Sequence, residues 1–196
     1  MCDFKSMIVT IDGDVHYSIR HDSHDQLLEE LKFKDDTADT ELMKFARVEI
    51  VPPDGDIFEQ DLNKWIFKID QSITPKWWGK DLEDKCFVQL KKALTAQVFI
   101  GQSDVELKDG MVFLKNSVVR GMHDNSAVQH MCDNSVVHHM RDNSVVRCMH
   151  DNSVVHHMRD NSVVHTLQNF GQYSKNGNIY VLDKKIVKQH TQIKGD

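Results

Sequence analysis

The sequence lacks the features that mark membrane proteins and secreted proteins. No apolar run approaches the roughly 20 residues that a membrane-spanning helix needs. The first residues, MCDFKSMIVTIDGD, contain no basic segment followed by an apolar one, so we expect no signal peptide. Cysteine is scarce, at 4 residues in 196, and without a secretion signal these side chains are expected to be reduced thiols. Together these absences predict a cytoplasmic protein.

Basic residues are neither abundant nor clustered. The chain has 24 Lys and Arg residues against 30 Asp and Glu residues, a formal net charge of −6, and the acidic excess lies in residues 1–115. A nucleic-acid-binding surface needs clustered Lys and Arg, so direct binding to DNA or RNA is disfavoured. Hydrophobic residues make up 40% of the chain and charged residues 28%, a balance that is typical of a soluble folded protein.

Catalytic motifs are also absent. The sequence has no Ser-His-Asp order, phosphate-binding loop or paired-carboxylate motif. Asp12, Asp14 and His16 could bind a metal ion, but Asp-Gly is also the turn sequence of a hairpin. Cys86 could be a nucleophile beside a histidine, but it lies on the apolar face of a predicted helix, where cysteines are usually buried. We assign no catalytic residue, and a non-enzymatic function is favoured.

One nine-residue phrase is repeated six times without insertion over residues 116–169. Ser at position 2, Val at position 4 and Met or Leu at position 7 barely change, whereas positions 5, 6 and 8 vary. The units are NSVVRGMHD from Asn116, NSAVQHMCD from Asn125, NSVVHHMRD from Asn134, NSVVRCMHD from Asn143, NSVVHHMRD from Asn152 and NSVVHTLQN from Asn161.

The phrase is typical of a strand followed by a turn. Val-Val favours a strand, and Asp-Asn favours a turn because both residues tolerate left-handed backbone. A helix would have to contain β-branched pairs and Asp-Asn-Ser in every unit, which disfavours it. The period therefore predicts a parallel β-solenoid with positions 2, 4 and 7 facing inward. The inward valines are expected to be Val119, Val128, Val137, Val146, Val155 and Val164.

Nonapeptide solenoids of the calcium-binding kind place two units in each coil, so that unit n stacks on unit n+2. Three units per coil is the alternative, and the calcium pattern Gly-Gly-x-Gly-x-Asp is missing. The Asn residues at position 1 are expected to form a hydrogen-bonded ladder. The Asp residues at position 9 would form a like-charge column, with neighbouring Arg and His side chains offsetting the repulsion.

The repeats are predicted to lie between covering segments. Residues 104–115 are expected to form an irregular leading coil, so that the solenoid spans residues 104–169. Residues 177–189 are expected to form a closing hairpin with Asp-Lys at its turn, within a C-terminal cap and polar tail over residues 170–196.

Residues 1–103 are predicted to form a small α+β domain, which makes the whole protein mainly β. SMIVTIDGDVHYSI alternates about an Asp-Gly turn and predicts a hairpin. Ser23 is expected to cap a helix over HDQLLEELKF. FARVEIV and KWIFKID are predicted strands, and DLEDKCFVQLKKAL from Asp81 predicts an amphipathic helix.

The outward positions of the repeat supply the candidate binding residues. A rigid coil would present Arg and His side chains to a protein partner, and its flat faces and exposed ends would also allow self-association. Stacked imidazoles would repel one another once protonated, which predicts a response to pH. The predicted partner-binding residues are Arg120, His138, His139, Arg141, Arg147, His156, His157 and Arg159.

A candidate metal site follows from the two-unit coil. Positions 6 and 8 of unit 2 are His130 and Cys132, and the same positions of unit 4 are Cys148 and His150. Stacking these units would place two thiols and two imidazoles on one small patch, a ligand set that tetrahedral zinc accepts. The alternative is a solvated surface produced by drift of a duplicated repeat. Zinc is therefore an alternative expectation, and no cofactor is the main one.

The NSVVxxM phrase, together with FARVEIVPPDGDIF, KWIFKIDQSITPKWW and the short closing hairpin, resembles a group of phage and prophage proteins. Those proteins have a small N-terminal domain followed by tandem NSxVxxM-type repeats, and the likeness spans most of the chain. The resemblance implies a phage or mobile-element origin, and hence the host cytosol. It implies no catalytic residues. We expect a protein-binding module, such as an inhibitor of a host or defence protein. The alternative is a His/Cys-based metal-binding or pH-responsive repeat protein.

Overall fold

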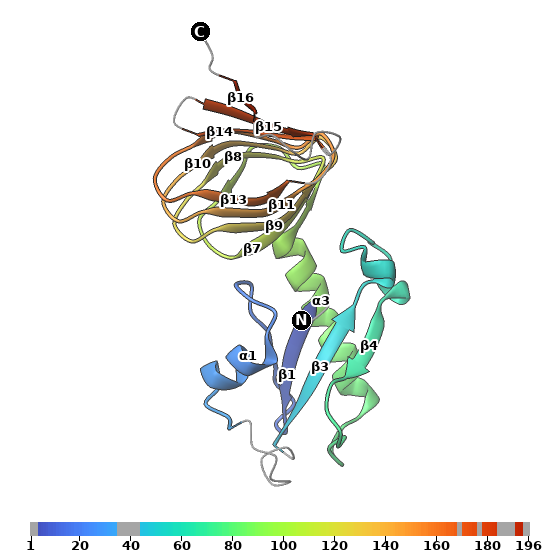
Figure 1. Cartoon of the computed structure of the whole chain (residues 1–196). Coiled ribbons are helices and arrows are strands. Elements are labelled where there is room, and N and C mark those ends of the chain that lie inside the picture. The colour runs from blue at the N-terminus through green and yellow to red at the C-terminus, as the bar shows by residue number, and fades with distance from the viewer. Residues whose placement is uncertain (1–3, 35–43, 168–169, 176–177, 184–190, 194–196) are drawn as a thin grey trace. The chain divides into compact units, whose positions relative to one another are not determined.

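The computed structural model describes residues 4–34, 44–167, 170–175, 178–183 and 191–193 (Figure 1). The chain divides into two compact units, residues 1–95 and residues 96–196. Within the described ranges, none of the helices combines the length and the apolar character that crossing a membrane requires. The protein is mainly β, with an α+β first unit and a parallel β-solenoid in the second, as the sequence predicts.

The first unit contains a four-stranded antiparallel sheet with strand order β2-β1-β3-β4. Its strands are β1 (Lys5–Thr10), β2 (Val15–His16), β3 (Phe45–Val51) and β4 (Ile66–Ile69). Two α-helices, α1 (His24–Glu30) and α3 (Lys80–Gln97), accompany the sheet. Short 3₁₀ turns occur at η1 (Pro53–Gly55) and η2 (Leu62–Lys64).

Local sequence signals explain these elements. The β1–β2 hairpin turns at Gly13, whose φ of 82° is accessible to glycine without a steric cost. Ser23 caps α1 by accepting a hydrogen bond from the backbone N–H of Gln26, as predicted. On the sheet face that α1 covers, Leu27 and Leu28 pack against strand residues in one core cluster. On α3, buried apolar residues recur every three or four positions, at Leu82, Cys86, Leu90 and Ala93.

The second unit is built from two parallel sheets whose strands alternate along the chain (Figure 1). One sheet has strand order β13-β11-β9-β7-β5, and the other contains β14-β12-β10-β8-β6, extended by β15 and β16. The strands are β5 (Val98–Ile100), β6 (Val105–Leu107), β7 (Met111–Lys115), β8 (Val118–Met122), β9 (Ala127–Cys132), β10 (Val136–Met140), β11 (Val145–Met149), β12 (Val154–Met158), β13 (Val163–Leu167), β14 (Phe170–Lys175), β15 (Asn178–Asp183) and β16 (Thr191–Ile193).

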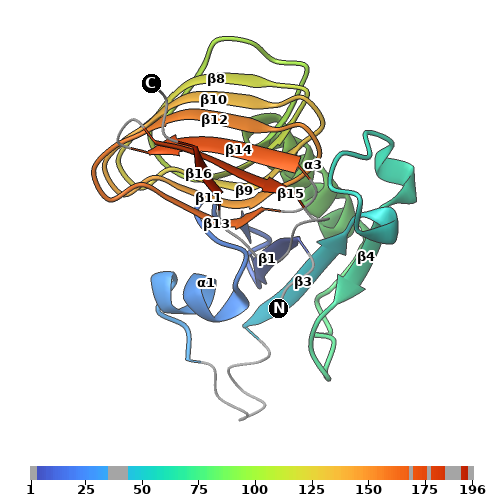
Figure 2. The same cartoon turned by 45° about the horizontal axis from the view of Figure 1, so that its top comes forward.

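Two repeat units form each coil, which confirms the stacking of unit n on unit n+2. Figure 2 shows β8, β10 and β12 stacked in succession. In this odd-unit sheet, Val137 of β10 is the Cα partner of Val155 in β12. In the even-unit sheet, Val146 of β11 is the partner of Val128 in β9. The register pairs positions 3, 4, 6 and 7 in both sheets, so equivalent positions of the repeat lie above one another.

The inward positions form one continuous core, as the invariant letters predict. The Val residues at position 4 and the Met residues at position 7 belong to a single buried cluster, and Val164 packs against it while only partly buried. The Ser residues at position 2 are buried at the corners of the coil. Each coil therefore removes a Val and a Met side chain of each sheet from water, the main source of solenoid stability.

The corners are held by polar ladders. The Asp residues at position 9 have left-handed backbone, with φ between 51° and 57°. Their carboxylates accept backbone hydrogen bonds from the preceding coil, as in the 3.1 Å contact from the N–H of Asp133 to Asp151 Oδ2. The Asn side chains at position 1 form the predicted ladder, with Asn161 Nδ2 donating to Asn143 Oδ1 at 3.3 Å. The Asp column is therefore contacted by backbone N–H groups. The sequence had predicted Arg and His side chains in that role.

The ends of the solenoid extend beyond the repeats. Strand β5 joins the even-unit sheet before the predicted leading coil, and β6 and β7 form that coil. After the repeats, β14 adds to β12 in parallel, and β15 then pairs with β14 in an antiparallel hairpin. The predicted closing hairpin covers residues 177–189. Its first arm contains β15, and the predicted second arm, in residues 184–189, lies outside the described residues.

Candidate functional site

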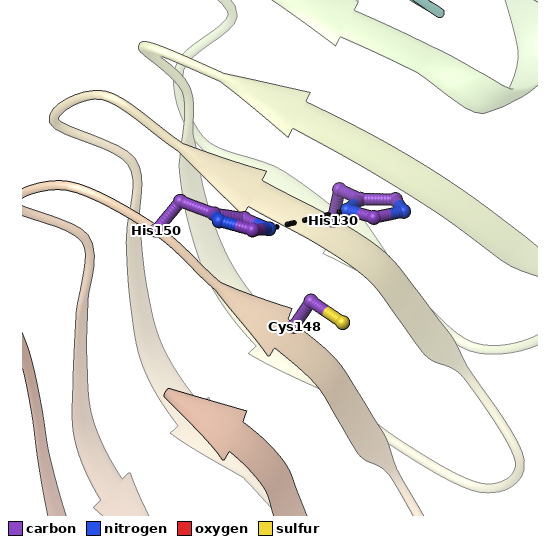
Figure 3. A group of neighbouring side chains, drawn as sticks. All are labelled: His130, Cys148 and His150. Carbon is purple, nitrogen blue, oxygen red and sulfur yellow. Dashed lines mark hydrogen bonds between the residues drawn. The ribbon is translucent and has the colours of Figure 1, made fainter. Parts of the chain in front are cut away.

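Three of the four predicted metal ligands lie together on the even-unit sheet. His130 in β9 and Cys148 in β11 are Cα partners, and His150 directly follows β11. The ligand atoms of these three side chains all lie within 4.8 Å of one another. His130 Nδ1 and His150 Nε2 are 3.3 Å apart and share a hydrogen bond, whose donor depends on the tautomers (Figure 3). We call these residues the His-Cys-His cluster.

The ring of His130 is held on both sides. It stacks on Phe113 of β7, with ring centroids 5.9 Å apart and planes inclined by 10°. On its other side lies His150, with a centroid distance of 5.5 Å and an angle of 17°. Burial lowers the pKa of His130, and the nearby His150 lowers it further. At neutral pH the His130 imidazole is therefore uncharged, which is the form that binds a metal ion.

Cys132 is the fourth predicted ligand, and its Sγ does not lie within the same distance of the other three ligand atoms. Position 8 of each unit stands at the end of the strand, where the chain turns the corner. A histidine at this position reaches back toward position 6 of the preceding coil because its ring nitrogens lie several bonds beyond Cβ. A thiol lies one bond beyond Cβ, so period-two alternation alone overstated the reach of Cys132.

A second cluster occupies the odd-unit sheet. The ring centroids of His139 and His157 are 5.2 Å apart, and the planes are inclined by 15°. Those of His138 and His156 are 5.0 Å apart in an edge arrangement. Exposed Arg141 and Arg159 follow the same two strands at position 8. We call the six residues the histidine–arginine face; they are His138, His139, Arg141, His156, His157 and Arg159.

Two histidines of the histidine–arginine face, His139 and His156, have pKa values below that of a free imidazole. The pKa of His139 is lowered by burial first, then by the neighbouring His157, Arg141, His138 and Arg159. The pKa of His156 is lowered by burial and then by His138 and His157. Both shifts have the same consequence, since a group whose pKa is lower in the folded chain binds protons more readily after unfolding.

We expect acidification to destabilise the solenoid through this face. Stability from His139 is fully present above the ordinary imidazole pKa of about 6.5 and is lost as the pH falls from there through the folded value. The melting temperature should therefore fall between about pH 7.5 and about pH 5.5. The fall should be smaller in a His139→Gln, His157→Gln variant. An equal fall in that variant and in the parent would contradict stacked-histidine repulsion. His165→Gln, at an exposed position of β13, is the matched control.

Two of the predicted partner-binding arginines are not part of the histidine–arginine face: Arg120 lies on β8, beside β10 in the same sheet, and Arg147 lies on the other sheet. Arg120 is engaged by the leading coil, with Nε 2.7 Å from Glu106 Oε1 and Nη1 3.4 Å from Asp104 Oδ1. Gly121 makes room for this contact, since an added Cβ would lie 2.7 Å from Glu106 Oε2. Arg147 is exposed on β11, in the sheet of the His-Cys-His cluster. The structure thus places seven of the eight predicted residues on the odd-unit sheet and Arg147 on the even-unit sheet.

The sequence offered two candidate sites in the first unit, a nucleophilic cysteine and a metal site, and its described residues form neither. Cys86 is fully buried, and burial raises the pKa of its thiol to about 12, which keeps it protonated and unreactive. Asp12, Asp14 and His16 do not form a metal-ligand group. Among the described residues, the His-Cys-His cluster is the group that could hold a metal ion.

A buried ion pair in the first unit was not predicted. Lys5 Nζ lies 2.6 Å from Asp22 Oδ1, and the Lys5 side chain is completely buried. A signal for it exists in the sequence, because Lys5, Met7 and Val9 alternate along β1 and therefore point to one face of the strand. A lysine in register with two buried apolar residues requires a nearby acceptor.

Comparisons with known proteins give no relative: no family model, curated protein or solved structure matches the chain. The resemblance to phage and prophage proteins therefore stays a prediction.

Proposed function

We propose that the solenoid is a protein-binding module whose histidine–arginine face binds an acidic segment of a partner protein. One observation carries this proposal. Positions 5, 6 and 8 of units 3 and 5 are all His or Arg, and parallel pairing of β10 with β12 sets these residues side by side on one sheet. Packing does not constrain the outward positions of a repeat. Six side chains that can all carry positive charge on one pair of strands therefore form a surface that attracts negative charge.

Charge and rigidity both suit this role. The guanidinium groups of Arg141 and Arg159 are exposed, and their fixed fork of donors matches a carboxylate. The side chains stand on a backbone fixed by ladder pairing, so little ordering is required on binding. An acidic partner would favour the charged imidazoles, and binding should strengthen as the pH falls.

We propose further that the partner is a host or defence protein that the module inhibits in the host cytosol. The support for this step is the likeness of the repeat phrase and of the N-terminal segments to phage and prophage proteins. This likeness suggests the class of partner. The chemistry of the histidine–arginine face suggests that the partner presents an acidic surface.

The proposal is tested with a defined acidic probe. Immobilised full-length protein is expected to bind poly-glutamate peptide more tightly at about pH 6 than at about pH 7.5, because imidazoles titrate in this range. Replacing all six residues of the face with Gln should abolish the binding, whereas Arg147→Gln on the other sheet should leave it unchanged. Equal binding by the six-fold variant would contradict the proposal. Tighter binding of a DNA duplex of matched charge would favour a nucleic-acid function instead.

A further inference from the structure

We propose that His130, Cys148 and His150 bind one borderline-soft divalent cation of the zinc class, with three protein ligands and a fourth coordination position open. The site lies on the even-unit sheet and does not depend on the function proposed for the histidine–arginine face. Imidazole nitrogen and thiolate sulfur are the ligands that such cations prefer.

The separation of the two imidazole nitrogens fits tetrahedral coordination. Bonds of 2.0–2.1 Å from zinc to each nitrogen, at a tetrahedral angle, put the nitrogens about 3.3 Å apart. His130 Nδ1 and His150 Nε2 are 3.3 Å apart. The thiol Sγ lies within 4.8 Å of a ring nitrogen of each histidine, whereas the bound separation would be about 3.6 Å. The sulfur would have to move closer to both imidazoles when a cation binds.

The scaffold fixes the ligands in advance of binding. His130 and Cys148 stand opposite each other in register on adjacent parallel strands, and Figure 3 shows both beside His150. The stacking of His130 on Phe113 limits rotation of the ring. Each of the three residues is half-buried, so a bound cation would be partly shielded and would still have an open side. Such support orients ligands as outer-shell contacts do in metalloproteins.

Proton transfer accompanies the binding. The Cys148 thiol gives its proton to water, and the resulting thiolate forms a bond to the cation. The proton that now lies between His130 Nδ1 and His150 Nε2 must leave that position, and it is held instead on the other nitrogen of the donor ring. Water or a ligand from a partner occupies the fourth position. One proton is therefore released for each cation bound.

The other histidine pairs provide a built-in comparison. His139 and His157 also stack at 5.2 Å across one coil, but position 6 carries His in both units of that column. That column therefore supplies no thiolate. A thiolate signal separates the proposed site from weak cation binding by exposed histidines.

Cobalt(II) titration of the untagged, chelator-treated full-length protein tests the proposal. We expect one equivalent to bind and to produce a thiolate-to-cobalt charge-transfer absorption in the near ultraviolet. Cys148→Ser should abolish this absorption, and loss of the thiolate should weaken cobalt binding at least about tenfold. Competition with zinc should remove the absorption from the parent. Circular dichroism should show that Cys148→Ser remains folded, because the residue faces outward between core positions 4 and 7.

Matched variants decide between the alternatives. Cys2→Ser, Cys132→Ser and the double variant His139→Gln, His157→Gln should retain the absorption. A parent without it, or an absorption that survives Cys148→Ser, would overturn the site. An absorption lost in Cys132→Ser as well as in Cys148→Ser would replace the three-ligand site with a four-ligand one.

Discussion

Val146→Asp is expected to unfold the solenoid under conditions in which the parent is stable. Val146 is completely buried in the continuous core between the two sheets, and the valine positions above and below it in β9 and β13 carry valines as well. An ionised carboxylate there would have no counter-ion within the apolar core. We expect a loss of about 3–5 kcal/mol in the free energy of unfolding, the cost of an uncompensated buried charge.

Urea denaturation followed by circular dichroism of the strand signal measures this loss. Arg147→Asp is the matched control, because it places the same carboxylate at the next, exposed position of β11. The control should change the free energy of unfolding by no more than about 0.5 kcal/mol. Tryptophan fluorescence reports on the first unit alone, since the three tryptophans, at positions 65, 77 and 78, all lie in residues 1–95. Equal stability of the two variants would contradict the inward assignment of position 4.

The repeat made the second unit predictable to the level of single side chains. Packing constrains positions 2, 4 and 7 in every unit, so their invariance in the sequence reveals the inward direction directly. The period alone left two or three units per coil open, and the two-unit coil, taken from calcium-binding nonapeptide solenoids, brought His130 beside Cys148. Outside the repeat each position occurs only once, so no comparison of equivalent positions shows which side chains face inward. Strand β5 and the support of His130 by Phe113 depend on irregular segments that the phrase does not describe.

Side-chain reach also limited the prediction. The alternation rule gives the face on which a residue lies but not how far its side chain extends beyond a corner. Position 8 is such a corner, and there a histidine enters the cluster while Cys132 does not. The Asp column shows a related limit. Its contacts are backbone N–H groups of the preceding coil, whose direction is fixed by left-handed backbone and is not visible in the residue types.

The buried Lys5–Asp22 pair predicts a second large effect, in the first unit. Lys5 Nζ lies 2.6 Å from Asp22 Oδ1 and also donates to the Ser18 carbonyl at 2.8 Å, with aromatic rings of Phe4 and Tyr17 nearby. Burial lowers the pKa of Lys5 and raises that of Asp22, while their attraction opposes both shifts. Burial favours the neutral form of each partner, and the attraction between Lys5 and Asp22 favours the charged forms. The charged state of each residue therefore depends on the other.

Asp22→Asn should reduce the free energy of unfolding of the first unit by about 3–5 kcal/mol, because the Lys5 ammonium loses its counter-ion while it stays buried. The pKa of Lys5 should then fall further, so that raising the pH recovers part of the loss as the amine becomes neutral. The double variant Lys5→Met, Asp22→Leu should regain most of the parent stability, since removing both charges removes the desolvation cost.

An exposed ion pair of equal length supplies the control for this prediction. Lys64 Nζ also lies 2.6 Å from a carboxylate, Glu59 Oε2, but the Lys64 side chain is 55% exposed. Lys64→Met should cost far less than Asp22→Asn, because water screens the exposed pair and solvates the remaining partner. Urea denaturation followed by tryptophan fluorescence compares the variants. If Asp22→Asn cost no more than Lys64→Met, the Lys5 ammonium would have to reach water, and burial would not be the source of its dependence on Asp22.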